Sequence, residues 1–204
     1  MPLTLPTPAR YFARCWSQPQ HPSPEARGQT QDGIRRRLAL LRASPSSGLG
    51  DCVVSEGEQS LPLLFAPAYP QVLSHGDLSR TNILVDEDSY EITGIVDWSR
   101  AEILPFGMDL DCLYLTTGYL DFEGWHDYAC RSQLHEAFWT EFWSASGMGD
   151  DGQRSEIRHW AERAARIGAV LRYAFRRNAD GSASEILAPE GSLAWRQLRT
   201  WLTT

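Results

Sequence analysis

The chain has 204 residues, a formal net charge of −7 and 42% hydrophobic residues. This size and composition are typical of one soluble domain with a sizeable core. The acidic balance argues against a nucleic-acid or anionic-membrane surface, and no apolar run approaches the roughly 20 residues of a membrane span. Four widely spaced cysteines without a C-x-x-C pair indicate reduced thiols and a cytoplasmic location.

Residues 1–28 hold six of the twelve prolines. Because proline lacks an amide hydrogen and blocks regular pairing, this segment is predicted to be mostly irregular, with at most a docked helical turn at residues 9–16. Arg10 and Arg14 give it some character of a mitochondrial transit peptide, which stays an alternative. We therefore divide the chain into residues 1–28 and a domain of residues 29–204.

Residues 33–43 are predicted to form a helix with one apolar side. Proline and glycine break it at residues 44–50. The Gly48-Leu49-Gly50 sequence there is interpreted as a plain turn, since no strand–loop–helix context for a phosphate loop surrounds it. A second helical or extended stretch passes through residues 61–65.

Two short strands, at residues 83–85 and 91–96, are predicted to form a hairpin around a polar turn. Asn82 stands at the entry of the first strand and Asp97 at the exit of the second, fifteen residues apart. Antiparallel pairing returns these two ends to within side-chain reach of one metal ion.

The rest of the chain is predicted to be helical apart from one loop. Residues 108–120 form an apolar helix, and residues 134–142 and 157–175 show amphipathic patterns. Residues 181–191 are predicted to be a loop, and residues 194–202 a short closing helix.

The residues that carry chemistry lie between Leu73 and Asp111. His75-Gly76-Asp77 is followed by Asn82, and Asp97 comes after the hairpin. Phosphoryl transfer needs one carboxylate that accepts or orients the proton of the attacking hydroxyl. It also needs hard oxygen ligands, such as an Asn and a second Asp, for the Mg²⁺ that bridges the nucleotide phosphates. The spacing from Asp77 to Asn82 is that of the H-x-D-x-x-x-x-N catalytic loop of kinases.

This segment resembles the C-terminal lobe of the aminoglycoside phosphotransferase and choline kinase family, which has a protein-kinase-like fold. The loop His75, Asp77 and Asn82 matches H-G-D-x-x-x-x-N, and Asp97-Trp98 stands in place of the protein-kinase D-F-G. The resemblance covers roughly residues 60–178. The form IVDWSRAEILPFG looks most like members found in filamentous fungi.

The resemblance implies ATP-dependent transfer of the γ-phosphoryl group to a hydroxyl of a small molecule. Asp77 would be catalytic, and Asn82 and Asp97 would bind Mg²⁺ and, through it, ATP. His75 and Asp111 would support the loop structurally. Asp109 fits a helix N-terminal cap.

Several side chains keep two readings. Arg80 lies either near the phosphates or in solvent, and Trp98 is expected to pack rather than to bind base or sugar. Asp121, Glu123 and Asp127 either line an acidic pocket for a cationic substrate or are simply solvated.

The predicted fold class is α+β, mostly α-helical: the C-terminal lobe of a protein-kinase-like fold, with catalytic core 73–111 and a small hairpin carrying the catalytic and metal residues. The N-terminal β-lobe is expected to be absent, because only 74 residues precede His75 and a five-stranded sheet with its turns and helix needs most of a hundred. All 19 basic residues are arginine, so the lysine that holds nucleotide phosphates in kinases is missing.

Two functions follow from this. The chain is a small-molecule phosphotransferase represented by its catalytic lobe, or it is a truncated or degenerate pseudoenzyme that acts as a binding module. A protein kinase is disfavoured because no A-P-E follows Asp97-Trp98. Apolar surface exposed at the lobe interface is expected to promote association.

Overall fold

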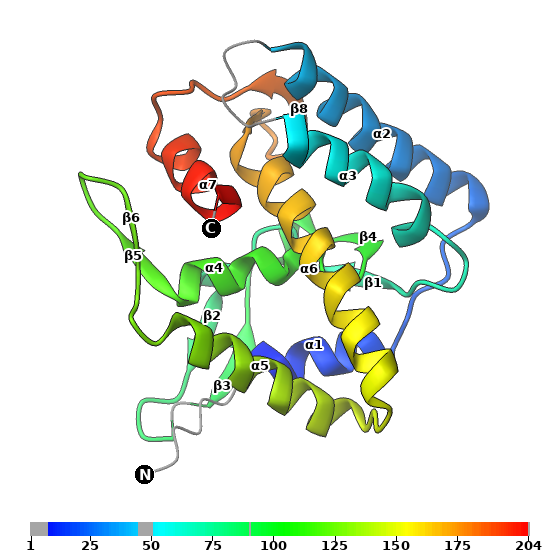
Figure 1. Ribbon diagram of the computed structural model, residues 1–204, viewed down its shortest axis with the longest axis vertical. Coiled ribbons are helices and arrows are strands. Elements are labelled where there is room, and N and C mark those ends of the chain that lie inside the picture. The colour runs from blue at the N-terminus through cyan, green and yellow to red at the C-terminus, as the bar shows by residue number, and fades with distance from the viewer. Residues whose placement is uncertain (1–7, 45–50, 90, 204) are drawn as a thin grey trace.

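The structure is a computed structural model that describes residues 8–44, 51–89 and 91–203 (Figure 1). Helices make up most of this described part. The α-helices are α1 (Pro8–Ser17), α2 (Pro24–Ala43), α3 (Asp51–Leu64), α4 (Cys112–Thr116), α5 (Arg131–Ser146), α6 (Asp151–Tyr173) and α7 (Leu193–Thr203). Short 3-10 helices form at η1 (Arg80–Asn82), η2 (Trp98–Arg100) and η3 (Met108–Asp111).

The strands of the described chain pair two by two, and every pair is antiparallel. The pairs are β1 (Gln71–Ser74) with β4 (Glu102–Pro105), β2 (Ile83–Val85) with β3 (Ile92–Ile95), β5 (Gly118–Leu120) with β6 (Trp125–Asp127), and β7 (Phe175–Arg177) with β8 (Ala183–Leu187). The prediction of a mixed α and β domain that is mostly helical is confirmed, as is the β2–β3 hairpin.

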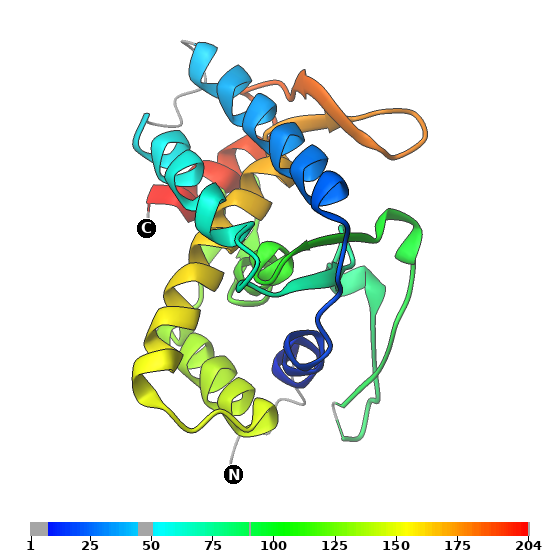
Figure 2. The same ribbon diagram turned by 90° about the vertical axis from the view of Figure 1, so that its right-hand side faces the viewer.

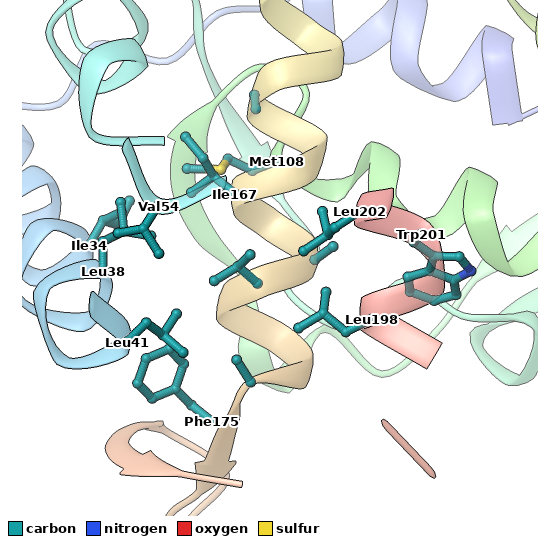
Figure 3. Close-up of a cluster of buried hydrophobic side chains, with 14 of the residues drawn as sticks. Ile34, Leu38, Leu41, Val54, Met108, Ile167, Phe175, Leu198, Trp201 and Leu202 are labelled. Atoms are coloured by element: carbon teal, nitrogen blue, oxygen red, sulfur yellow. The ribbon is translucent and has the colours of Figure 1, made fainter. Parts of the chain in front are cut away.

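Helix α6 runs through the middle of the molecule, with α2 and α3 on one side and α7 on the other (Figures 1 and 2). Its N-terminus is capped by Asp150, whose carboxylate accepts hydrogen bonds from the amides of Gly152 and Gln153. Around α6 packs a core drawn from all these helices, which includes Ile34, Leu38, Leu41, Val54, Ile167, Leu198 and Trp201 (Figure 3).

Small residues on α6 let it approach the η3 segment at backbone distance. A Cβ added at Gly168 would lie 1.9 Å from the carbonyl oxygen of Met108, which no real side chain tolerates. Arg172 lies one turn further along the same face of α6, since residues four apart in an α-helix share a face. The close contact at Gly168 therefore delivers Arg172 to the residues that follow Met108.

The N-terminal region is more ordered than its prolines suggested. Helix α1 buries Ala9, Phe12 and Ala13 and packs on α5, and the ring of Phe12 lies 6.4 Å from that of Phe106. Proline is tolerated at the first turn of a helix, where the amide hydrogen has no partner. Helix α2 likewise begins at Pro24, and Ser23 caps it. The docked helical turn allowed at residues 9–16 is present as the full helix α1, whereas the irregular structure expected before residue 28 is wrong for residues 24–28.

Two other expectations need correction, and a third lies largely outside the described residues. The predicted helix 108–120 is interrupted: η3 leads into the five-residue α4, and residues 118–120 form a strand. The predicted loop 181–191 contains strand β8. The break at residues 44–50 lies, after residue 44, outside the described residues. No helix in the described ranges is long and apolar enough to cross a membrane.

Candidate active site

The catalytic loop, defined here as residues 75–82, connects β1 to β2 and begins with a close backbone approach. Gly76 has φ +75°, and a Cβ at this position would lie 2.3 Å from the carbonyl oxygen of Arg100. Both the left-handed conformation and the contact exclude a side chain. Glycine between His75 and Asp77 thus lets the loop pass directly over η2.

His75 is fully buried and serves as a link between the loop and β3. Its Nε2 lies 2.8 Å from the carbonyl oxygen of Val96, and its Nδ1 accepts a hydrogen bond of 3.2 Å from the amide of Asp77. A neutral ring with the proton on Nε2 satisfies both contacts, because a carbonyl only accepts and an amide only donates. The imidazole therefore positions Asp77 and has no free nitrogen for proton transfer.

Asp109 supports the start of the catalytic loop through its carboxylate. Its carboxylate accepts hydrogen bonds from the backbone amides of His75 and Gly76, the latter at 3.2 Å. Arg172 adds a second support: it donates to Asp109 at 3.1 Å and to the carbonyl oxygen of Leu78 at 3.2 Å. The cap assigned to Asp109 from the sequence is not formed, since η3 and α4 have no side-chain cap.

Asp111 contacts Arg172 and makes no hydrogen bond to the described residues of the catalytic loop. Its carboxylate is 3.1 Å from Nε of Arg172, and its side chain is 0% exposed. Burial raises the pKa of Asp111 to about 7, although the positive charge of Arg172 opposes the shift. One guanidinium thus stands between two buried carboxylates, Asp109 and Asp111, and only Asp109 touches the loop.

Asp77 presents its carboxylate beside η2. Its Oδ2 accepts a hydrogen bond of 2.8 Å from Arg100, in an ion pair whose side chains are about one-third exposed. The other carboxylate oxygen accepts no hydrogen bond from the described residues. Asp77 is therefore held in one orientation and keeps one oxygen for an incoming hydroxyl.

Asn82 is tied to both Asp77 and β3. Its side-chain nitrogen donates to the carbonyl oxygen of Asp77 at 2.9 Å, and its own carbonyl accepts from the amide of Val96 at 3.0 Å. The first contact leaves the amide oxygen of Asn82 as its remaining ligand atom. The second places Asp97, the next residue after Val96, at the same end of the hairpin.

Asp97 is exposed and adopts a left-handed conformation, with φ 62° and ψ 60°. It is the sole non-glycine residue with positive φ in the described part of the chain. A hydrogen bond of 2.7 Å from the Ser99 hydroxyl lowers the pKa of Asp97, so the carboxylate is ionised at neutral pH. Such strain is tolerated mainly where a side chain must be aimed at a ligand.

The donor set fits Mg²⁺. One amide oxygen and one ionised carboxylate are hard ligands, and Mg²⁺ commonly keeps water and phosphate oxygens in its other positions. No group of three or more His, Cys, Asp or Glu side chains suited to a metal occurs among the described residues. A protein cage is thus not formed there, and Asn82 and Asp97 are the residues that would hold the ion.

A family model, described as the phosphotransferase enzyme family, matches residues 6–143. The chain belongs to this family. The match contains the whole catalytic loop and the β2–β3 hairpin, and it begins well before residue 60, where the sequence resemblance was placed. The comparison with curated proteins finds no match. Family membership implies phosphotransferase chemistry in general terms.

In this phosphotransferase-family domain, the side chains of Arg80 and Trp98 are bound to neighbouring backbone carbonyl oxygens. Arg80 donates to the carbonyl oxygens of Leu115 and Gly118, which ties η1 to the end of α4 and the start of β5. Trp98 donates to the carbonyl oxygen of Ile95 at 2.9 Å, and its ring lies 4.8 Å from that of His75. Trp98 packs, as expected. Arg80 is exposed, in agreement with the solvent alternative, and its two hydrogen bonds fix its orientation.

The acidic side chains of the β5–β6 hairpin are engaged within that hairpin and its neighbours. Asp121 accepts from the amides of Glu123 and Gly124 and lies 3.0 Å from Nε2 of His126. Asp127 accepts from the indole of Trp125 at 2.8 Å and from Arg131 at 2.5 Å. Asp121 and Asp127 are thus satisfied by the fold, which disfavours the acidic pocket.

Sequence reasoning missed two arginines at this site. Arg172 interrupts the apolar face of α6 directly after the small residues Ala161, Ala165 and Gly168. An arginine on a buried helical stripe signals a buried acidic partner. Arg100 follows Asp97 by three residues, but nothing in its local sequence marks Asp77 as its partner.

Proposed function

We propose that the chain catalyses the transfer of the γ-phosphoryl group of ATP to a hydroxyl group of a small molecule, with Mg²⁺ as cofactor. The observation that carries this proposal is the chain of hydrogen bonds that brings the backbones of Asp77, Asn82 and Asp97 together at one end of the β2–β3 hairpin. Asn82 hydrogen-bonds the backbone of Asp77 at 2.9 Å and the amide of Val96, which precedes Asp97, at 3.0 Å. Membership of the family supports the same chemistry.

In this proposal Asp77 orients the acceptor. Its free carboxylate oxygen accepts the hydrogen bond of the acceptor hydroxyl and takes the proton as the hydroxyl attacks. Arg100 holds the other oxygen at 2.8 Å, and His75 fixes the loop backbone at Asp77. These contacts hold the carboxylate in place before the reaction, so less orientational freedom has to be lost to reach the transition state.

Asn82 and Asp97 would hold the metal through the amide oxygen and the carboxylate. A Mg²⁺ ion held there would neutralise charge on the transferred phosphoryl group. Asp97 combines a left-handed conformation, which clusters at ligand sites, with a hydrogen bond from Ser99 that lowers the pKa of its carboxylate. Both features support the assignment of Asp97 to the metal.

A second candidate is a truncated or degenerate pseudoenzyme that keeps the acceptor or metal site as a binding module, without turnover. The absence of lysine favours it over the enzyme, because kinases use a lysine to hold the nucleotide phosphates and the 19 basic residues here are all arginine.

Calorimetric titration with ATP, with and without Mg²⁺, separates these candidates. We expect Mg²⁺-dependent binding that is lost in Asp97→Ala and kept in Asp88→Ala, an exposed carboxylate in the hairpin turn. Binding followed by phosphorylation of at least one compound in a panel of alcohols supports the enzyme. Binding without transfer to any of them supports the module, and no binding at millimolar ATP contradicts the enzyme.

Other features of the proposal concern location and association. Six apolar side chains on or beside β1–β4 and β2–β3 are each 37–49% exposed: Leu73, Leu84, Val85, Val96, Trp98 and Ile103. Exposed apolar groups of this kind support association through the face that carries the site. A cytoplasmic location, the fungal type and a catalytic lobe without its N-terminal partner stay predictions.

A further inference from the structure

A small cavity lies beside the catalytic loop, on the side of α2 and β7. Its volume is about 40 Å³, and its lining includes Gly76, Arg37, Arg177 and Glu102. A site for one water needs roughly 10–15 Å³ by this measure, so the cavity holds about three waters. That space suits the oxygen atoms of a carboxylate or phosphate group.

Arg37 and Arg177 enter this cavity from different elements, and neither has a carboxylate within 4.0 Å among the described residues. Their hydrogen bonds are long: Arg37 donates to Gly33 at 3.4 Å, and Arg177 donates to Gly76 at 3.4 Å and to Gly181 at 3.5 Å. All three acceptors are backbone carbonyls. The two guanidinium charges are thus left without a direct counter-charge.

The electrostatic situation of both arginines is unfavourable. Desolvation lowers the pKa of each guanidinium, and Arg177 acts on Arg37 as a like charge. Glu102 attracts both but forms no ion pair with either in the described chain, so the three groups leave an excess of one positive charge. The other two charged side chains that line the cavity, Asp109 and Arg172, are paired with each other. Arg172 differs, because two buried carboxylates contact it. A bound anion would supply what Arg37 and Arg177 lack.

The position of the cavity relates it to the acceptor rather than to the nucleotide. Arg177 hydrogen-bonds Gly76, the residue next to Asp77. Helix α2 and the β7–β8 hairpin approach the catalytic loop from above in Figure 2, whereas the β2–β3 hairpin extends below it. An anion between Arg37 and Arg177 would therefore lie close to Gly76 and Asp77, the residue proposed to orient the acceptor.

We propose that the acceptor alcohol carries an oxyanion, a carboxylate or a phosphate group, which binds between Arg37 and Arg177. This inference rests on the proposed phosphotransferase function and names its substrate class. Arginine suits the role because its planar fork of donors matches both oxyanions. The β5–β6 hairpin agrees with an anionic rather than a cationic acceptor, because the carboxylates of Asp121 and Asp127 already have hydrogen-bond partners.

Titration with inorganic phosphate in the absence of nucleotide tests the cavity. We expect phosphate to bind the wild-type chain and to bind Arg37→Gln and Arg177→Gln about tenfold or more weakly, as the loss of a charge-assisted hydrogen bond requires. Arg36→Gln and Arg176→Gln are matched controls, because both side chains are exposed, and their affinity should change less than twofold. No phosphate binding, or equal loss in all four variants, overturns the site.

Glu102→Gln gives a test in the opposite direction. Removing this carboxylate should tighten phosphate binding, because it removes the one negative charge among the three groups. The result does not depend on whether the arginine variants fold. Unchanged or weaker binding in Glu102→Gln contradicts the proposed site.

Competition with glycerate and glyceramide tests the substrate class. Glycerate, which has hydroxyls and a carboxylate, should displace phosphate, whereas its uncharged amide should not. Phosphate binding without displacement by glycerate means that the cavity takes free phosphate, which overturns the acceptor assignment. Since none of these titrations contains ATP, they can succeed or fail independently of the ATP and Mg²⁺ titration.

Discussion

The β2–β3 hairpin and helix α6 flank the same catalytic loop, but their side chains meet it under different conditions. Asp97, at the end of the hairpin, is exposed and in a left-handed conformation. Arg172, on α6, has a side chain only 10% exposed that contacts two carboxylates and a loop carbonyl. The side that would bind ligand is open and strained, whereas the side that supports the loop is buried and ion-paired.

The hairpin and the end of helix α6 also differ in that only the hairpin lies within the family match. The matched residues, 6–143, include the hairpin and Asp109 but end in α5. Arg172 and Arg177 lie beyond the match and still contact the catalytic loop. The residues of the proposed chemistry thus lie in the matched part, while the support of the loop and the proposed anion site also use Arg172 and Arg177, which follow it.

The largest expected effect comes from the ligand-binding side. Asp77→Asn keeps the size of the side chain but removes its capacity to take a proton, so phosphotransferase activity should fall roughly 10²- to 10⁴-fold. Its ion pair with Arg100 is partly exposed, so the free energy of unfolding should change by no more than about 1 kcal/mol. Rates of phosphate transfer and urea unfolding measure the two effects, and Asp88→Asn is the control. Equal activity of the two variants would contradict the assigned role.

A substitution on the supporting side, helix α6, should mainly lower the free energy of unfolding. Arg172→Met leaves Asp109 and Asp111 buried without a counter-charge, which should lower the free energy of unfolding by about 3–5 kcal/mol. Arg176→Met, at an exposed neighbouring arginine, should change it by less than about 0.5 kcal/mol. Urea unfolding of both variants checks this. A similar midpoint for wild type and Arg172→Met would show that the support is not ion-paired.

Asp111 makes the supporting side sensitive to pH. Burial raises its pKa to about 7 in the folded chain, compared with about 3.9 when unfolded. Between these values the folded state binds more protons, so this group's contribution to stability is lost as pH rises from about 4 to about 7. Asp111→Asn cannot titrate, so its advantage over wild type in urea unfolding should grow across this range. A difference independent of pH contradicts the assignment.

The smallest expected effect tests whether the backbone of Asp97 is strained. Alanine at a position with φ 62° is unfavourable, and glycine is not. Asp97→Gly should therefore be more stable than Asp97→Ala by about 1 kcal/mol in thermal or urea unfolding. Both variants should lose Mg²⁺-dependent nucleotide binding. The reverse order of stability would mean that the left-handed conformation does not persist in solution.

The elements that the sequence predicted correctly are those specified by local pattern. The β2–β3 hairpin follows from two short apolar runs around a polar turn, and α6 follows from its long amphipathic repeat. The β1–β4 pair was missed because its strands are separated by the whole hairpin and η2. Helix α1 was missed as a full helix because proline was weighed as a breaker, whereas Pro8 occupies a first-turn position where it does no harm.

The site shows the same division. Asp77, Asn82 and Asp97 were chosen by spacing and by the ends of one hairpin, and the structure gathers their backbones there. The sequence assigned the support of the loop to Asp111, but Asp109 accepts the hydrogen bonds from the loop amides and Asp111 acts only through Arg172. The 3-10 geometry, with three residues per turn, decides which of them faces His75. Arg100 and Arg177 reach the loop through tertiary contacts that no local pattern encodes.

The β2–β3 hairpin has strands of only three and four residues, and an isolated two-stranded hairpin is marginally stable at best in water. Local opening of this hairpin would separate Asn82 from Asp97 while α6 and its core remain folded. The affinity for an ion that bridges them therefore includes the free energy that keeps the hairpin closed. Metal binding would slow hydrogen exchange at the Val96 amide, and the same exchange in the free chain would report how often the site comes apart.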